Sequence, residues 1–539
     1  MQANFKRNLG MWALAAALVP AATTSCTKDL DQVPSYSANA EVIYGSPAQI
    51  QQALARLYAT LAVSGQSGPA GDPDISGIDE GFSNYLRQYW LAQEVTTDEA
   101  IIAWNDGNLP DYNTLTWNAN NEFVRAMYDR IFYQVALCNE FVRQTTDDKL
   151  ASRGINSTEA TSIRQYRAEA RFLRALSYYH ALDMFGSVPF ADENSAVGGT
   201  LAKQISRADL FRYIDTELKA IEPALMASRA VYGRADQGAC WTLQTKLYLN
   251  AETYLGAGNG RYTDAVTYAS KVINAGYSLA PEYRLLFLAD NDRSAARNEI
   301  IFPITFDGAS TKTYGGMPFI IHAAVGGSMP LTDYGVSAGW NGNRAKSNLV
   351  DLFTSTTDTR NTFYTAGQTK QISDIFTFAQ GYTVTKFKNV SSTGVPGKDD
   401  KTNGGAGDFV DTDFPMFRLA DVELMYAEAV LRGGGGGNQG TALQYVNAIR
   451  SRAQSPALGA LTLDNILDER GRELYWEGHR RTDLIRFGKF TSGTYVWAFK
   501  GSTDRKTAAG QGVPATRVIF PIPTTDLVAN PNLVQNPGY

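Results

Sequence analysis

Residues 468–490, DERGRELYWEGHRRTDLIRFGKF, combine side chains that could carry out chemistry. Three glutamates follow one another at the i,i+4 spacing of one helix face, and a histidine and two arginines come directly after them. A carboxylate and a histidine can act as acid and base in a hydrolase, and clustered arginines can contact phosphate groups. The residues concerned are Glu469, Glu473, Glu477, His479, Arg480 and Arg481. Whether they form an active site depends on the element that carries them.

The spacing of the same segment also predicts a packed structural helix. Two leucines and two glycines recur at intervals of 4, 3 and 4 and form a narrow stripe, on which glycine lets a second helix come close; they are Leu467, Gly471, Leu474 and Gly478. Opposite charges flank this stripe at i,i+3 or i,i+4 and neutralise one another. The predicted pairs are Glu469 with Arg472, Arg470 with Glu473, and Glu477 with Arg480 or Arg481. We therefore interpret the segment as structural, so that Glu473→Gln or His479→Ala should affect folding before ligand affinity.

Other motifs of catalysis and metal binding are incomplete. His180, His322 and His479 are the only histidines and form no H-E-x-x-H or His-x-His pattern, so a zinc hydrolase would lack its ligands. The G-x-S-x-G match around Ser337 lacks the hydrophobic strand before it and the helix after it that a nucleophile elbow requires. These incomplete motifs predict no catalytic residue, metal site or cofactor, and no calcium loop is readable.

Two tryptophans in polar loops are better candidates for a binding site. Trp104 lies in AWNDGN and Trp340 in SAGWNGN, where turn formers replace the apolar neighbours of a core tryptophan. An exposed indole can lie against the C–H face of a sugar ring while polar neighbours contact the sugar hydroxyls. The predicted ligand-binding residues are Trp104, Trp340, Tyr314, Tyr334, Asp106 and Asn341. The alternative is that these rings fold back and fill gaps in their own domain.

The overall charge argues against nucleic acid as a partner. The 539 residues include 49 Lys and Arg against 54 Asp and Glu, which gives a net charge of −5 and offers no general attraction to phosphate backbones. The chain also has 48 Gly and 20 Pro, which indicate many turns, and 61 aromatic residues (28 Tyr, 25 Phe and 8 Trp). This composition favours recognition surfaces carried on loops.

The N-terminus predicts a lipoprotein signal. Residues 1–25 contain a basic start, an apolar stretch and small residues directly before Cys26, as in a bacterial lipoprotein box. We expect cleavage before Cys26, acylation of its thiol, and a hydrophilic tether over residues 26–45, which would place the protein outside the cytoplasm. The alternative is an ordinary signal peptide with an incidental cysteine. Cys138 and Cys240 are either two buried thiols or a disulfide.

Periodicity predicts a mainly α fold with an irregular insertion. Residues 46–282 form an N-terminal helical region, in which a Ser-Pro start at Ser46 precedes apolar residues spaced 4, 3 and 4. Residues 251–273 and 427–450 are similar, each a helix, a glycine turn and a second helix, which predicts a tetratricopeptide-like scaffold of helical hairpins. Residues 283–415 predict a loop-rich ligand-binding region with short strands, and residues 416–539 a C-terminal helical hairpin and tail of the same domain.

Four stretches together resemble one family. Residues 166–190, 417–432, 469–490 and 520–539, in this order and spacing, are similar to the SusD/RagB family of outer-membrane nutrient-binding lipoproteins. The resemblance covers nearly the whole chain after the predicted signal. It implies a tetratricopeptide-like lipoprotein on the cell surface that captures oligosaccharide or polysaccharide and passes it to a SusC-like TonB-dependent β-barrel transporter.

The resemblance also indicates where the ligand binds. Family members are binders rather than enzymes, and their ligand-contacting aromatics come from loops that correspond in position to those of Trp104 and Trp340. Some members bind calcium. Two alternatives remain open, a helical-repeat lipoprotein that binds a peptide or a protein, and a glycoside hydrolase.

Overall fold

The computed structural model describes residues 40–65, 68, 73–198, 200–401 and 407–539. The predicted signal peptide, Cys26 and most of the predicted tether lie outside these residues. The described chain opens with α2 (Ala40–Tyr44), where the Tyr44 ring meets Phe141 edge-on with the centroids 6.0 Å apart. Within the described ranges, no helix is long and apolar enough to cross a membrane.

The first half of the chain is helical, as predicted. Ser46 caps the first long helix by accepting a hydrogen bond from Gln49 N, and the apolar stripe Ile50, Leu54, Leu57 and Leu61 is buried. The helices of this half are α2, α3 (Pro47–Ala62), α4 (Tyr85–Trp90), η3 (Leu91–Val95), α5 (Pro110–Thr114), α6 (Glu122–Gln144), α7 (Asp147–Ser152), α8 (Ser157–Met184), α9 (Arg207–Ile221), η4 (Glu222–Ala224), α10 (Gln237–Leu249), α11 (Ala251–Leu255) and α12 (Tyr262–Ile273).

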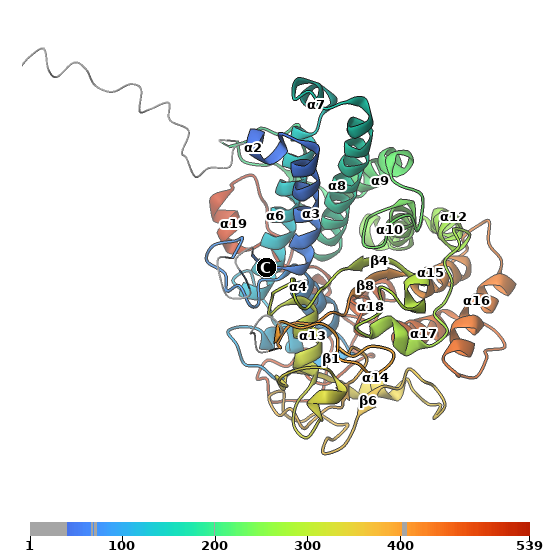
Figure 1. Ribbon diagram of the computed structural model, residues 1–539. Helices are drawn as coiled ribbons and strands as arrows, with labels where there is room; N and C mark the ends of the chain where they lie inside the picture. The colour runs from blue at the N-terminus through green and yellow to red at the C-terminus, as the bar shows by residue number, and fades with distance from the viewer. Residues whose placement is uncertain (1–39, 66–67, 69–72, 199, 402–406) are drawn as a thin grey trace, which may run out of the picture.

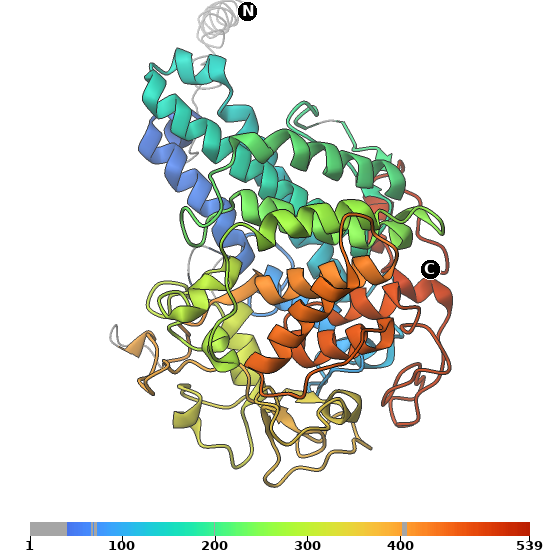
Figure 2. The same cartoon turned by 90° about the vertical axis from the view of Figure 1, so that its right-hand side faces the viewer.

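Long helices pack side by side and form the frame of the molecule (Figures 1 and 2). α6 lies against α8, α8 against α9 and α10 against α12, and the stack continues through α15 (Leu419–Leu431) and α16 (Gln439–Arg452). Each similar stretch of sequence is a helix, a glycine turn and a second helix, namely α11 with α12 and α15 with α16. The mainly α fold with helical hairpins is therefore confirmed.

The remaining elements are short and belong mostly to the loop-rich segment and the tail. The strands pair antiparallel in two-stranded ribbons: β1 (Ala100–Ile102) with β5 (Asn343–Ala345), β2 (Val188–Pro189) with β3 (Gln204–Ile205), β4 (Ile300–Ile304) with β8 (Phe414–Arg418), and β6 (Phe363–Tyr364) with β7 (Thr383–Val384). The helices are η5 (Tyr283–Phe287), η6 (Ala295–Asn298), α13 (Gly316–Ala324), η7 (Leu331–Asp333), α14 (Ser347–Asp351), α17 (Leu463–Leu474), α18 (Arg480–Arg486), η9 (Ala515–Val518) and α19 (Thr524–Ala529).

Two of these ribbons position the loop-rich segment. Because β4 precedes most of it and β8 follows it, their pairing makes the segment leave and rejoin the helical frame at one place. The β1–β5 ribbon ties its middle back to residues 100–102 of the N-terminal half. In both views the yellow and light-orange loops gather at one end of the molecule, below the stacked helices (Figures 1 and 2).

Residues 468–490, which we call the charged segment, do not form the single helix that their spacing predicts. α17 ends at Leu474, the backbone turns through Trp476 with φ +65° and Gly478 with φ +80°, and α18 begins at Arg480. The left-handed conformation at Gly478 suits glycine, which explains its place in a turn rather than on a helix stripe. At Gly471, an added Cβ would lie 2.6 Å from Leu352 Cδ1, so a leucine side chain, not a second helix, occupies the space that this glycine leaves.

The two remaining cysteines are separate buried thiols. Cys138 on α6 and Cys240 on α10 are both free and fully buried. Burial raises the pKa of Cys138 to about 12 and also raises the pKa of Cys240, so neither thiol ionises at neutral pH. Of the two predicted alternatives, the buried thiols are correct.

Candidate functional site

The β1–β5 ribbon brings the two predicted tryptophan loops together. Beyond the paired strands, Ala103 N donates to Gly342 O at 2.9 Å, so Trp104 and Trp340 lie at the same end of the ribbon. Trp104 Nε1 donates to Trp340 O at 2.9 Å, and the two ring centroids are 6.5 Å apart. An added Cβ at Gly342 would lie 2.9 Å from Trp104 Cε2, so glycine at this position lets the indole approach the strand.

Tyr314 completes a group of three partly exposed rings, Trp104, Tyr314 and Trp340, which we name the aromatic cluster. Tyr314 meets Trp340 edge-on with the centroids 6.3 Å apart, and Phe409 lies 5.7 Å from Tyr314. Trp340 stacks on His322 at 4.5 Å with the planes 24° apart. Because His322 covers one face of the Trp340 indole, a ligand would have to contact the opposite face.

Arg87 of α4 supports the cluster from the protein interior. Its Cζ lies 4.5 Å from the Phe319 centroid and 5.5 Å from the Trp104 centroid, in cation–π geometry. Burial lowers the pKa of Arg87 to about 10, and the charges of Asp106 and Asp79 oppose this shift, so the guanidinium stays charged at neutral pH. Asp106 itself is exposed two residues after Trp104.

Asn341 lies beside the cluster, whereas Tyr334 is buried apart from it. Asn341 has φ +51° and its Oδ1 accepts a hydrogen bond from Gly327 N at 3.0 Å, which joins two neighbouring loops. Tyr334 is only 4% exposed, with Lys388 Nζ 5.0 Å from its ring centroid, and no ring contact links it to the cluster within the described ranges. The structure therefore gathers five of the six predicted residues and leaves the Tyr334 ring in the core.

The arrangement suits a polyhydroxylated ring better than an ion or a reaction. Three aromatic rings at different angles offer apolar faces, and the exposed Asp106 carboxylate and the Asn341 amide are polar groups beside them. Sugar rings present C–H groups on their faces and hydroxyls at their edges, which matches this combination. Ser337, the serine of the G-x-S-x-G match, lies in a loop and donates from Oγ to Asp408 Oδ1 at 2.6 Å.

Three supporting residues were not predicted from the sequence. Arg87, His322 and Phe409 come from three distant segments, and each touches a ring of the cluster. His322 stands in an apolar helix and Phe409 follows a glycine-rich stretch, so neither has local neighbours that indicate a binding role. No pattern in one sequence reports contacts between such distant positions.

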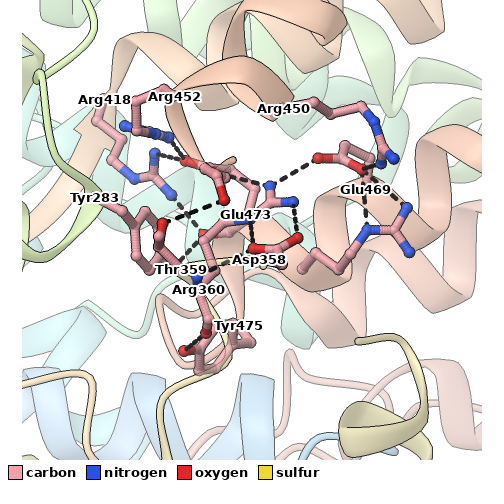
Figure 3. A network of polar contacts seen from close by, with 12 residues as sticks. Tyr283, Asp358, Thr359, Arg360, Arg418, Arg450, Arg452, Glu469, Glu473 and Tyr475 are labelled. Atoms are coloured by element: carbon pink, nitrogen blue, oxygen red, sulfur yellow. Dashed lines mark hydrogen bonds and ion pairs between the residues drawn. The ribbon is translucent and has the colours of Figure 1, made fainter. Parts of the chain in front are cut away.

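The charged segment builds a different structure, a buried network of ion pairs (Figure 3). The Glu473 carboxylate pairs with Arg360 at 3.0 Å, with Arg418 at 2.6 Å and with Arg452. Glu469 pairs with Arg360 at 2.7 Å, and it also contacts Arg450 and Arg472. Burial alone would raise the pKa of Glu473, but Arg452, Arg418 and Arg360 hold it far below its usual range. The carboxylate is therefore a structural anion rather than a general acid.

The predicted local charge pairs are mostly wrong. Of them, only Glu469 with Arg472 forms, at 2.9 Å. The other charged side chains named here are buried and pair with residues outside their own helix turn. The pairs are Arg470 with Asp421 and Asp483, Glu477 with Arg418 and Lys386, Arg480 with Asp98, and Arg481 with Asp183. The segment thus joins the two halves of the chain.

His479 belongs to this network and is poorly suited to catalysis. Its side chain is 6% exposed, and Nδ1 lies 3.2 Å from Lys246 Nζ, which in turn pairs with Asp421 at 2.8 Å. Burial and the charge of Lys246 lower the pKa of His479 to about 3, so the imidazole is neutral at physiological pH. Elsewhere in the described part of the chain, no group of three or more His, Cys, Asp or Glu side chains could hold a metal ion.

Sequence comparison relates the chain to proteins that bind glycans. Residues 304–539 match the SusD family. Over 589 aligned residues, which cover 100% of both chains, the protein is 33% identical to the starch-binding protein SusD of Bacteroides thetaiotaomicron.

Solved structures share the fold. Surface glycan-binding protein A from Bacteroides fluxus superposes with a TM-score of 0.69 at 19% identity, over 92% of this chain and 100% of that one. The surface glycan-binding protein A from Bacteroides thetaiotaomicron in complex with laminarihexaose has a TM-score of 0.68 at 20% identity, over 91% of this chain and 99% of that one. At these identities the likeness establishes the fold, and the names of all three proteins describe binding rather than catalysis.

Proposed function

Because the chain belongs to the SusD family, we propose that it is a cell-surface protein that binds oligosaccharide at the aromatic cluster and passes it to a TonB-dependent transporter of the SusC type. The observation that carries the proposal is the convergence of Trp104, Tyr314 and Trp340 from distant segments into one partly exposed group. Trp104 and Trp340 also pack against the core, and each ring stays partly exposed.

The cluster would hold a sugar chain by stacking and by hydrogen bonds at its edges. The open face of Trp340 would take one pyranose ring, since His322 covers its other face. Trp104 and Tyr314 stand at angles of 42° and 67° to Trp340, so a ligand that touches all three must curve rather than lie flat. Asp106 and Asn341 would accept and donate hydrogen bonds to hydroxyls at the rim.

An α-glucan of the starch type is the first ligand to test. The relative that is 33% identical over its full length is named as starch-binding, whereas the laminarihexaose complex is 20% identical and supports the fold alone. A curved chain also fits the helical twist of an α-glucan better than it fits an extended one. No turnover is part of the proposal, since the carboxylates and histidine of the charged segment are locked in structural contacts.

The location at the outer membrane depends on Cys26. We propose that acyl chains on this residue anchor the protein and that the following residues act as the tether, as the sequence pattern predicts. The transporter partner is proposed on family membership. Loss of the protein from membranes after Cys26→Ala would support the lipid anchor. Co-purification of a β-barrel with the full-length protein would support the transporter partner.

Calorimetric titration of the soluble chain against a panel of oligosaccharides tests the binding site. We expect binding of maltoheptaose, and we expect Trp104→Ala combined with Trp340→Ala to weaken it by about 2–5 kcal/mol, since two stacking surfaces are lost. A matched control replaces Trp241, a half-buried indole on α10 far from the cluster in sequence, whose Nε1 donates to Glu222. Unchanged affinity in the double variant would contradict the assignment of the site. Release of new reducing ends from the sugar would contradict a purely binding role.

A further inference from the structure

A groove lies between α3 and the chain that leads into Tyr314 of the aromatic cluster. It has a volume of about 630 Å³, within the range of small-molecule sites. It is lined by residues of α3, by Thr305 and Ser310 to Lys312, and by Tyr166 and Arg234. No catalytic, metal or partner role accounts for this groove.

The groove and the cluster share one segment of chain. Lys312 lines the groove and Tyr314 belongs to the cluster, and two residues span at most about 7 Å even when fully extended. Behind this segment, Asn84 donates from Nδ2 to Ala62 O, at the groove, and accepts from Arg87 N at 3.0 Å, next to Trp104. The two sites therefore lie on either side of a single wall, close enough for one flexible ligand to reach both.

The lining chemistry favours a neutral polyhydroxylated ligand. The described residues that line the groove include two tyrosines, three hydroxyl side chains and three cations, and no carboxylate. Two of the cations are already neutralised, because Arg56 pairs with Asp74 and Arg234 Nε donates to Glu169 at 3.0 Å. These ion pairs also fix the orientation of the guanidinium groups. Oriented donors without net charge suit sugar hydroxyls, whereas an anion would find little uncompensated charge besides Lys312.

We propose that this groove is a second subsite for the same glycan chain, which holds the sugar units that extend past the aromatic cluster. The inference rests on the proposed function and deepens it, since it makes the site selective for long chains. Short oligosaccharides fill only the aromatic cluster. Longer ones continue over the Lys312–Tyr314 segment and place further sugar units against Tyr166 and the guanidinium donors.

The test compares maltotriose with maltoheptaose by calorimetric titration. We expect the wild type to bind maltoheptaose about tenfold more tightly than maltotriose. Ala55 is an exposed groove residue on α3, so Ala55→Trp should fill the groove without disturbing the core. This variant should keep its affinity for maltotriose and lose the gain in affinity that the wild type shows for maltoheptaose. Lys312→Ala should reduce this gain in affinity. The matched control, Gln52→Trp, puts the same bulk on an exposed position of α3 outside the groove and should keep the gain.

The outcomes separate this inference from the proposed function. If Trp340→Ala weakens both sugars but the wild type shows no gain with length, or the gain survives Ala55→Trp, the second subsite is wrong and the aromatic cluster stands. The proposed function fails if the wild type binds neither malto-oligosaccharides nor the corresponding laminari-oligosaccharides. It also fails if the Trp340→Ala variant binds these sugars as tightly as the wild type does. In either case the second subsite fails with it. If Ala55→Trp lowered the affinity for maltotriose and for maltoheptaose equally, the second subsite would also be overturned, because the effect would come from damage to the aromatic cluster.

Discussion

The sequence offers both the aromatic cluster and the charged segment as candidate sites, and the two differ in almost every physical respect. The charged segment is one continuous stretch of acids, arginines and aromatic residues, whereas the aromatic cluster gathers three rings from distant stretches. The charged segment is buried, and its carboxylates and guanidinium groups are compensated by partners from other elements (Figure 3). The aromatic cluster is partly exposed, with rings that touch each other at their edges and keep surface available.

The difference shows that reactive residue types are weak indicators of a site when their environment is unknown. A buried ion pair stabilises little compared with an apolar contact, but removing one partner leaves an uncompensated charge, so such residues are needed for folding. An exposed aromatic ring contributes little to folding and leaves its apolar face for a ligand. Four experiments test this difference between the two regions.

Glu473→Gln should have the largest effect, and on stability alone. Three arginines would lose their shared counter-ion inside the protein, which should lower the free energy of unfolding by about 3–5 kcal/mol. Chemical denaturation measures the change. The control Glu282→Gln removes one member of an exposed pair with Arg284 and should cost less than about 0.5 kcal/mol. A folded Glu473→Gln protein that lost sugar affinity but no stability would reverse the roles of the two regions.

His479 should make the charged segment sensitive to acid. Its pKa is about 3 in the folded protein and 6.5 without perturbation, so its contribution is complete above pH 6.5 and is lost as the pH falls towards 3. At pH 5 the loss is about 2 kcal/mol, from 1.5 pH units at about 1.4 kcal/mol each. Buried carboxyl groups with a raised pKa, such as Glu423 at about 8, stabilise the folded protein as the pH falls. The effect of His479 is therefore measured as a difference between the wild type and a variant.

The suitable measurement is the difference in unfolding free energy between the wild type and His479→Asn, at pH 7 and at pH 5. The advantage of the wild type should shrink by about 2 kcal/mol, because only the wild type loses this contribution. A difference that is independent of pH would mean that His479 titrates normally and is not held in a buried, neutral state. Sugar affinity of the folded variant should not follow this change.

Trp340→Ala should affect affinity and spare stability. Loss of one stacking face should weaken sugar binding by about 1.5 kcal/mol, roughly tenfold in Kd, with a small change in Tm. Trp104→Ala should lower both the sugar affinity and the Tm, because the Trp104 indole also packs on Phe319 and donates to the Trp340 backbone. Titration and thermal unfolding of the two variants side by side separate the roles. A larger loss of Tm in Trp340→Ala than in Trp104→Ala would contradict the assignment.

Asn341→Ala should have the smallest effect. The residue adopts φ +51° and holds Gly327 N, so alanine would be strained by about 1 kcal/mol and would release the adjoining loop. We expect affinity to fall by a few-fold, measured by titration. Asn341→Gly relieves the strain without restoring the hydrogen bond, so the difference between the two variants separates the conformational contribution from the hydrogen bond.

Local patterns predicted the scaffold well and the charged segment poorly. Ser46, Pro47 and the stripe from Ile50 to Leu61 specify their helix within a few residues, and such short-range patterns do not depend on the rest of the chain. The turn at Gly478 was missed. It interrupts a stretch whose apolar spacing is helical, and packing against other elements overrides that spacing.

The sequence alone was sufficient for the helical hairpins, the loop-rich insertion and the family, because each depends on spacing, composition or motifs within short stretches. The choice of the tryptophans as ligand contacts stays a prediction. The sequence did not determine which rings reach the surface together. The β1–β5 ribbon places Trp104 beside Trp340, and the path of the chain after β4 adds Tyr314 while Tyr334 becomes buried. Long-range pairing also directs Glu473 to three distant arginines instead of to its helix neighbour. Such outcomes depend on burial and on contacts between distant residues, which exist only once the chain has folded.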